Sequence, residues 1–137
     1  MKVLFDTNVI LDVWLARPAF VDDSAYAMSM VERGVLTGFL CPTTITTLHY
    51  IAKKELGESA VRMHLKQLMS CFQMGILDAA GFELALGSQV RDFEDAVLEA
   101  VAIKSGLDAI VTRNKKDFSG CRLMVFTPLE LIRQFLN

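Results

Sequence analysis

Short apolar runs alternate with segments of helical periodicity along the whole chain. The runs have the length and residue types of buried strands, and we place them at Lys2–Phe5, Gly38–Cys41, Gly75–Leu77, Ala109–Val111 and Leu123–Phe126. Strands that alternate with helices, without repeats or low-complexity linkers, are typical of a parallel sheet covered by helices on both faces. The pattern therefore predicts an α/β protein, a three-layer α/β/α sandwich that forms a single domain over residues 1–137.

The expected helices begin and end at residues with known preferences for helix termini. They cover Asn8–Leu15, a segment from Asp22 or Asp23 to about Arg33, one from Pro42 to Gly57, one from Ser59 to Phe72, a short one at Phe82–Leu86 and one from Asp92 to Gly106. The aspartates and the serine are the expected N-caps, and the glycines are the expected stops. A last helix begins with a capping box, in which Thr127 is the cap and Glu130 lies three residues on.

Composition and charge narrow the class of protein. Apolar residues make up 53% of the chain, yet none of their runs approaches the roughly 18 residues that span a bilayer. Asp6 interrupts the first apolar run, so this segment does not read as a signal peptide. Cys41, Cys71 and Cys121 are odd in number and lie in apolar contexts, which favours reduced thiols. We therefore expect a cytoplasmic protein without a membrane segment.

The formal net charge of −2 gives no global sign of nucleic-acid binding. A local basic cluster remains, formed by Arg113, Lys115 and Lys116. These side chains can bind phosphate groups, and the alternative interpretation is an ordinary solvated surface.

Three aspartates are expected at one edge of the sheet. Asp6 follows the first strand, Asp95 lies in the first turn of the helix that Asp92 opens, and Asp117 follows the strand Ala109–Val111 after a short loop. Carboxylates brought together repel one another unless a cation holds them, and oxygen ligands suit Mg²⁺ or Mn²⁺. A metal held there can activate water for phosphodiester hydrolysis. Each aspartate also has a simpler interpretation, as a helix cap, a residue favoured by the helix dipole, or a turn residue.

The chain resembles the PIN-domain family, particularly the VapC-like toxins of bacterial toxin–antitoxin systems. The motifs that carry the resemblance are Val3–Val9, Asp92–Ala96 and Ile110–Phe118, and their order covers nearly the whole chain. The resemblance implies a divalent-metal-dependent ribonuclease with an α/β/α fold and with Asp6, Asp95 and Asp117 as catalytic metal ligands. It implies supporting roles, through hydrogen bonds to the ligands, for Thr7, Asn8, Thr112 and Asn114. It also implies an RNA substrate, a cognate antitoxin in an apolar groove between helices of the first half, and a homodimer.

The sequence departs from the family pattern at one position. Many members carry a glutamate on the helix after the second strand, where this chain has Thr47 or, in a register shifted by two residues, His49. Thr47 can support a metal-bound water by a hydrogen bond but cannot neutralise a cation. Asp12 and Glu94 are conceivable substitutes, although surface exposure is the expected role of each.

Three functional hypotheses therefore compete. The first is an active ribonuclease with Mg²⁺ or Mn²⁺ as its cofactor. The second is a PIN-like module that cleaves weakly or not at all and binds RNA or a protein partner, as the absence of an acid at Thr47 suggests. The third is a receiver-like or phosphatase-like domain that uses Asp6 as a phosphate acceptor, which the asparagine two residues later makes weaker.

Overall fold

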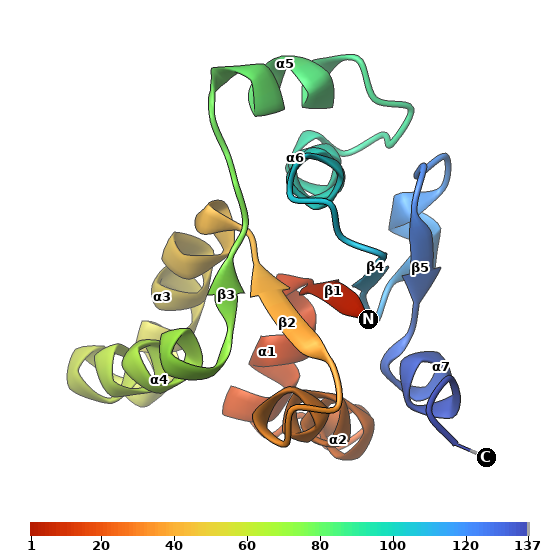
Figure 1. Cartoon of the computed structure of the whole chain (residues 1–137). Helices are drawn as coiled ribbons and strands as arrows, with labels where there is room; N and C mark the ends of the chain where they lie inside the picture. The colour runs from red at the N-terminus through yellow and green to blue at the C-terminus, as the bar shows by residue number, and fades with distance from the viewer. Residues whose placement is uncertain (137) are drawn as a thin grey trace.

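A parallel sheet of five strands forms the centre of the protein. The computed structural model describes residues 1–136. Its strands are β1 (Lys2–Phe5), β2 (Thr37–Leu40), β3 (Gln73–Met74), β4 (Ala109–Val111) and β5 (Met124–Phe126). They pair in the order β3-β2-β1-β4-β5, so that β1 lies in the middle between β2 and β4 (Figure 1). The predicted parallel sheet is confirmed.

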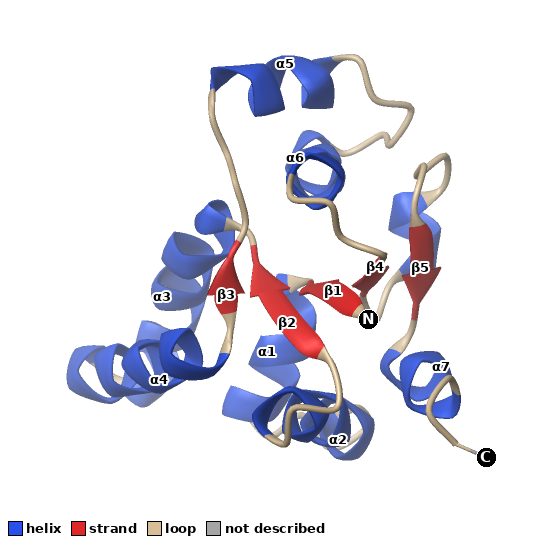
Figure 2. Ribbon diagram, in the orientation of Figure 1, coloured by secondary structure: helices blue, strands red, loops and turns tan. Residues whose placement is uncertain are grey.

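Helices cover both faces of this sheet. They are α1 (Thr7–Trp14), α2 (Val21–Glu32), α3 (Pro42–Leu56), α4 (Glu58–Cys71), α5 (Ala79–Leu86), α6 (Phe93–Lys104) and α7 (Pro128–Arg133), with a 3₁₀ turn, η1, at Lys115–Phe118. In Figure 2, α5 and α6 lie on one side of the sheet and α1, α2 and α7 on the other. None of these described helices has both the length and the hydrophobicity of a membrane span. The three-layer α/β/α architecture is therefore confirmed.

The alternation of side chains along β1 explains why the protein has two hydrophobic clusters. Val3 and Phe5 point into one cluster with residues of α1, α2, α3, α4 and α7, whereas Leu4 points into the other with α5 and α6. All three side chains are fully buried. The part of a strand that is buried on both faces has to be apolar, and in β1 this part is Val3–Phe5, so the next polar residue, Asp6, stands at the end of the strand.

Several predicted boundaries are wrong. The third strand lies at Gln73–Met74 rather than at Gly75–Leu77, because the chain leaves the edge of the sheet at Gly75, whose N–H makes a last hydrogen bond to Leu40. Two predicted N-caps also differ. Asp22 and Asp23 lie inside the first turn of α2, which has Phe20 at its cap. Ser59 lies inside α4, because Gly57, with a φ of 86°, already joins α3 to α4.

Other predicted helix ends agree with the structure. Asp92 caps α6 by accepting a hydrogen bond from the backbone N–H of Asp95, and Thr127 and Glu130 form both bonds of the capping box of α7. The short fifth helix begins earlier than expected, because Asp78 caps it and thereby extends it back to Ala79. Local side-chain hydrogen bonds thus decide where three of the helices begin.

Candidate metal-binding active site

A pocket of about 230 Å³ opens at the carboxyl edge of the sheet, beside the ends of β1 and β4. It brings together Asp6, Asp95 and Asp117, which are far apart in the sequence. The other lining residues are Thr7, Asn8, Leu11, Thr43, Thr47, Ile51, Glu94 and Leu98. A water molecule takes about 30 Å³ in the liquid, so the pocket has room for an ion and several waters.

Asp6 is held rigidly at the end of β1. It accepts a hydrogen bond from the backbone N–H of Thr7 at 2.7 Å through Oδ1, and one from the Thr112 hydroxyl at 2.7 Å through Oδ2. Its side chain is almost completely buried. The aspartate is therefore both the N-cap of α1 and a lining residue of the pocket. Each carboxylate oxygen keeps a second lone pair, so the cap and a metal ligand are compatible roles.

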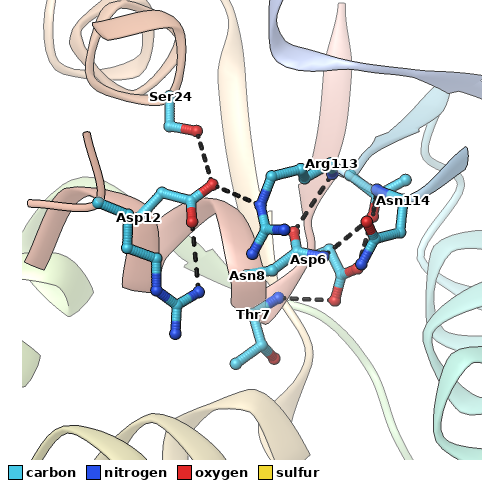
Figure 3. A network of polar contacts seen from close by, with 9 residues as sticks. Asp6, Thr7, Asn8, Asp12, Ser24, Arg113 and Asn114 are labelled. Atoms are coloured by element: carbon cyan, nitrogen blue, oxygen red, sulfur yellow. Dashed lines mark hydrogen bonds and ion pairs between the residues drawn. The ribbon is translucent and has the colours of Figure 1, made fainter. Parts of the chain in front are cut away.

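Thr112 connects the strand β4 to the residues around Asp6. Its fully buried hydroxyl donates to Asp6 and accepts from the backbone N–H of Asn114 at 3.1 Å and from Asn8 Nδ2 at 3.5 Å. Asn8 in turn accepts from the backbone N–H of Arg113 at 3.3 Å. Figure 3 shows how these contacts tie the start of α1 to the loop after β4. Asn8 supports the site through its side chain, whereas Asn114 contributes its backbone N–H.

Asp95 faces the pocket from the first turn of α6. Because Asp92 caps the helix through the N–H of Asp95, the carboxylate of Asp95 is not needed for capping. Burial raises the pKa of Asp95 to about 7, and the charges of Asp6, Asp92, Asp117 and Glu94 act in the same direction. At neutral pH, this carboxylate is therefore only partly ionised, and a bound cation would favour its charged form.

The pKa of Asp6 is raised as well. Burial is the main cause, and the charges of Asp117 and Glu94 add to it, against the hydrogen bonds from Thr112 and Thr7. Two perturbed carboxylates in one pocket are a common sign of a functional site, and here repulsion by neighbouring acids is part of the cause.

Asp117 lies on η1, where the acidic pocket meets two surface pockets. The larger, of about 540 Å³, has Arg113, Lys115 and Lys116 among its lining residues. The smaller, of about 220 Å³, is lined by Arg91 and Lys116 but also by the acids Asp92 and Asp117. Asp117 contributes to the lining of all three pockets. The arrangement places positive charge next to the acids but outside their pocket.

The donor set of the acidic pocket fits a hard divalent cation. Its polar lining consists of carboxylate, hydroxyl and amide groups, and no lysine or arginine within residues 1–136 contributes to it. Such oxygen ligands suit Mg²⁺ or Mn²⁺. In the described part of the chain, no three His, Cys, Asp or Glu side chains yet stand close enough together to hold an ion. Bare carboxylates repel one another, so the aspartates would have to turn inward when a cation neutralises them.

Comparison with known proteins identifies the family. The PIN domain family model matches residues 2–116. The chain belongs to the PIN-domain family. Among curated proteins, none matches it.

Solved structures agree with this assignment over nearly the whole PIN domain. A toxin–antitoxin complex from Klebsiella pneumoniae is 27% identical, with 92% of this chain and 97% of that chain covered and a TM-score of 0.69. VapBC2 from Rickettsia felis, solved with a DNA fragment from its promoter, is 15% identical, with 93% and 98% covered and a TM-score of 0.72. FitAcB from Neisseria gonorrhoeae is 19% identical, with 93% and 98% covered and a TM-score of 0.67. The resemblance to VapC-like PIN domains is confirmed.

On α3 of this PIN domain, Thr47 rather than His49 lines the pocket. The Thr47 hydroxyl donates to the carbonyl oxygen of Thr43 at 3.0 Å and lies 3.4 Å from Glu94 Oε1. His49 instead contacts the carboxylate of Glu58, with its Nε2 2.8 Å from Oε2. The wall that α3 contributes to the pocket is therefore uncharged.

Asp12 is not exposed, contrary to the expectation from the sequence. It is fully buried and outside the acidic pocket, where it accepts from Arg113 Nε at 2.9 Å, Arg17 Nη1 at 3.3 Å and the Ser24 hydroxyl at 3.3 Å (Figure 3). One sequence signal was available, since Asn8 and Asp12 are four residues apart on one helix face. Both contact the same arginine, Asn8 at its backbone and Asp12 at its side chain.

Arg113 is consequently fixed rather than free. Its guanidinium group lies 4.1 Å from the centre of the Phe20 ring, in addition to the ion pair with Asp12. Lys115 forms an exposed ion pair with Glu130, with Nζ 3.2 Å from Oε1. Within residues 1–136, Lys116 has no such ion pair. The predicted phosphate contacts of this cluster thus fall most readily to Lys116.

Proposed function

We propose that this PIN domain is a divalent-metal-dependent ribonuclease and the toxin of a type II toxin–antitoxin pair. The observation that carries the proposal is the acidic pocket, in which carboxylates from three separate segments line one space without a basic residue among them. Asp6 is buried, Asp95 is partly exposed and Asp117 is exposed. Carboxylates held close together repel one another unless a cation binds between them. The confirmed family and the VapC-like fold support the same reaction class.

Asp6, Asp95 and Asp117 would hold Mg²⁺ or Mn²⁺. When bound, the metal supplies Lewis-acid stabilisation of the charge that builds on the phosphate and lowers the pKa of a bound water. Thr112 and the backbone N–H of Thr7 keep both oxygens of Asp6 in place for this task. Thr47 can support a water in the pocket by a hydrogen bond.

RNA would approach across the basic pockets beside Asp117. Lys116 lines both of them, and Lys115 and Arg113 line the larger. Contacts from such side chains to phosphate oxygens position a strand without reading its sequence. The phosphodiester next to Asp117 is then the one presented to the acidic pocket.

The direct test uses labelled RNA with Mn²⁺ and two proteins, the wild type and Asp6→Asn. We expect cleavage by the wild type and a loss of more than about 100-fold in the variant, because ligand loss exceeds the 10- to 100-fold effect of losing an outer-shell partner. Asp22→Asn, which removes an exposed carboxylate on α2, is the matched control and should cleave like the wild type. Equal cleavage by the wild type and Asp6→Asn would place the activity elsewhere and refute the proposal.

A non-cleaving RNA- or protein-binding module is the second candidate, and the uncharged α3 wall at Thr47 favours it. Calorimetric titration with Mn²⁺ separates the two. Binding by the wild type that disappears in Asp95→Asn supports the enzyme, whereas a wild type that binds no Mn²⁺ supports the module.

An antitoxin partner would have a groove available on the other side of the molecule. A pocket of about 550 Å³ lies between α1, α2 and α4, and Trp14, Met28, Leu68 and Phe72 are among its apolar lining residues. The sequence predicts an antitoxin groove between helices of the first half, and we propose this one. Co-purification with the product of the neighbouring gene, lost on Trp14→Ala in a chain that remains folded, would support it.

We also propose a homodimer, which light scattering of the purified chain would test.

A further inference from the structure

We propose that Glu94 is the fourth acidic ligand of this metal centre, and that α6 thereby supplies the carboxylate that many PIN domains carry on α3. The inference rests on the proposed function, because it assigns one more residue to the same site. Glu94 and Thr47 are adjacent across the pocket, with Oε1 and Oγ1 3.4 Å apart.

The residues that α3 contributes to the pocket lining carry no negative charge. Thr43, Thr47 and Ile51 are spaced four residues apart, so they share the face of α3 that lines the pocket. None of them is charged. A hydroxyl can hold a water but contributes no net charge toward a divalent cation, so the deficit has to be met by another element.

Glu94 can meet this deficit from the opposite wall. It precedes Asp95 in the first turn of α6 and lines the same pocket. Its side chain is one methylene longer than that of an aspartate, and its carboxylate reaches the hydroxyl of Thr47. A carboxylate on residue 47 would project into this same region from the α3 side.

No structural bond explains this orientation of Glu94. Thr47 has a single hydroxyl proton, which the Thr43 carbonyl takes at the shorter distance of 3.0 Å, so the 3.4 Å contact is weak. Within the described residues, no lysine, arginine or histidine pairs with Glu94. Glu94 is exposed, and the helix dipole favours an acid at this position without directing its side chain toward Thr47. A cation in the pocket that Glu94 lines together with Asp6 and Asp95 would account for the direction.

The test is a carboxylate exchange between the two helices, measured by calorimetric titration of the full chain with Mn²⁺. Glu94→Gln should weaken Mn²⁺ binding about 10- to 100-fold. Thr47→Glu combined with Glu94→Gln should restore the affinity to within about threefold of the wild type. Glu55→Gln, which removes an exposed carboxylate of α3 outside the pocket, is the control and should bind like the wild type.

The outcomes separate this inference from the proposed function. If Asp95→Asn abolishes Mn²⁺ binding but Glu94→Gln binds like the wild type, the metal centre stands and the role of Glu94 is refuted. If Glu94→Gln weakens binding and the double variant does not recover it, Glu94 does not occupy the place of the α3 acid, and the exchange is refuted. If the wild type binds no Mn²⁺, both proposals fail. Thermal melts in EDTA confirm that each variant is folded.

Discussion

Two groups of carboxylates in this protein have opposite surroundings. Asp12 and Glu99 are fully buried, and each faces arginine: Arg113 and Arg17 for the first, and Arg122 for the second. The acids of the pocket at the end of the sheet have no arginine or lysine among their lining neighbours in residues 1–136. The chain thus pairs two fully buried carboxylates with arginine, and it leaves the pocket acids, of which only Asp6 is buried, without a basic side chain in the same lining.

The pKa values of Asp95 and Glu99 are shifted in opposite directions. Burial raises the pKa of Asp95 to about 7, with neighbouring acids adding to the effect. Burial acts on Glu99 in the same direction, but hydrogen bonds from Ser88 and Arg122 outweigh it, and the pKa of Glu99 is lowered. A buried carboxylate without a partner destabilises the fold, so its retention points to a bound ligand, whereas a paired one is explained by structure alone.

The largest expected loss of stability follows from replacing Asp12, one of the two acids paired with arginine. Asp12→Asn leaves Arg113 and Arg17 facing an uncharged side chain, and breaking such a buried pair costs about 3 kcal/mol of the free energy of unfolding. Urea unfolding measures this cost. Asp22→Asn removes an exposed carboxylate of α2 and should change stability by about 0.5 kcal/mol or less. An Asp12→Asn protein as stable as the wild type would show that this ion pair is not needed for folding.

A comparison within α6 comes next, since this helix carries acids of both kinds, Glu94 and Asp95 in the pocket and Glu99 paired with Arg122. Glu99 accepts hydrogen bonds from Ser88 Oγ at 2.6 Å and from the backbone N–H of Arg122 at 2.8 Å. Glu99→Gln should therefore cost about 2 kcal/mol in urea unfolding, the range for hydrogen bonds to a charged group. Glu94→Gln should leave the metal-free stability within about 0.5 kcal/mol. If both variants lose the same free energy of unfolding, the paired acid and the pocket acid do not differ in their contribution to stability.

Replacing Asp95 is expected to have a smaller effect, and to raise rather than lower the free energy of unfolding. Because its pKa is about 7 in the folded protein and near 3.8 in the unfolded chain, the folded state binds more protons between pH 4 and 7. The contribution of Asp95 to the stability of the metal-free protein should therefore fall as the pH rises through this window. In EDTA at pH 8, Asp95→Asn should be more stable than the wild type by about 1 to 2 kcal/mol, after allowance for solvent screening.

The same two proteins measured with saturating Mn²⁺ provide the control. A ligand that binds only the folded state stabilises it, so Mn²⁺ should stabilise the wild type and leave Asp95→Asn nearly unchanged. If the stability advantage of Asp95→Asn over the wild type does not grow between pH 4 and 7 in EDTA, the raised pKa of Asp95 is refuted.

The smallest effect concerns the basic residues beside Asp117. Lys116→Gln should weaken RNA binding about threefold and reduce the slope of log affinity against log salt by about one, as loss of one phosphate contact does. Fluorescence anisotropy in an Asp6→Asn background measures binding without cleavage. Lys66→Gln, on the exposed face of α4, is the control. An unchanged salt slope for Lys116→Gln would remove this residue from the RNA path.

Much of the fold could be predicted because its signals are local. Apolar runs such as Val3–Phe5 become buried strands, and the side chains of Asp92 and Thr127 begin their helices by bonding backbone groups three residues away. The wrong boundaries have a common origin as well. Gly75–Leu77 is as apolar as a strand, but the chain has already left the sheet edge there, and only packing against neighbouring elements decides that.

The sequence by itself determined the alternation of strands and helices, and with it the placement of Asp6, Asp95 and Asp117 at one edge of a parallel sheet. Only the tertiary structure decided which acids are neutralised. Asp12 meets Arg113 across 101 residues, and Glu94 meets Thr47 across 47 residues. A charge is stabilised or left unpaired by whatever lies within a few ångströms of it, and for these side chains the neighbours come from distant parts of the chain.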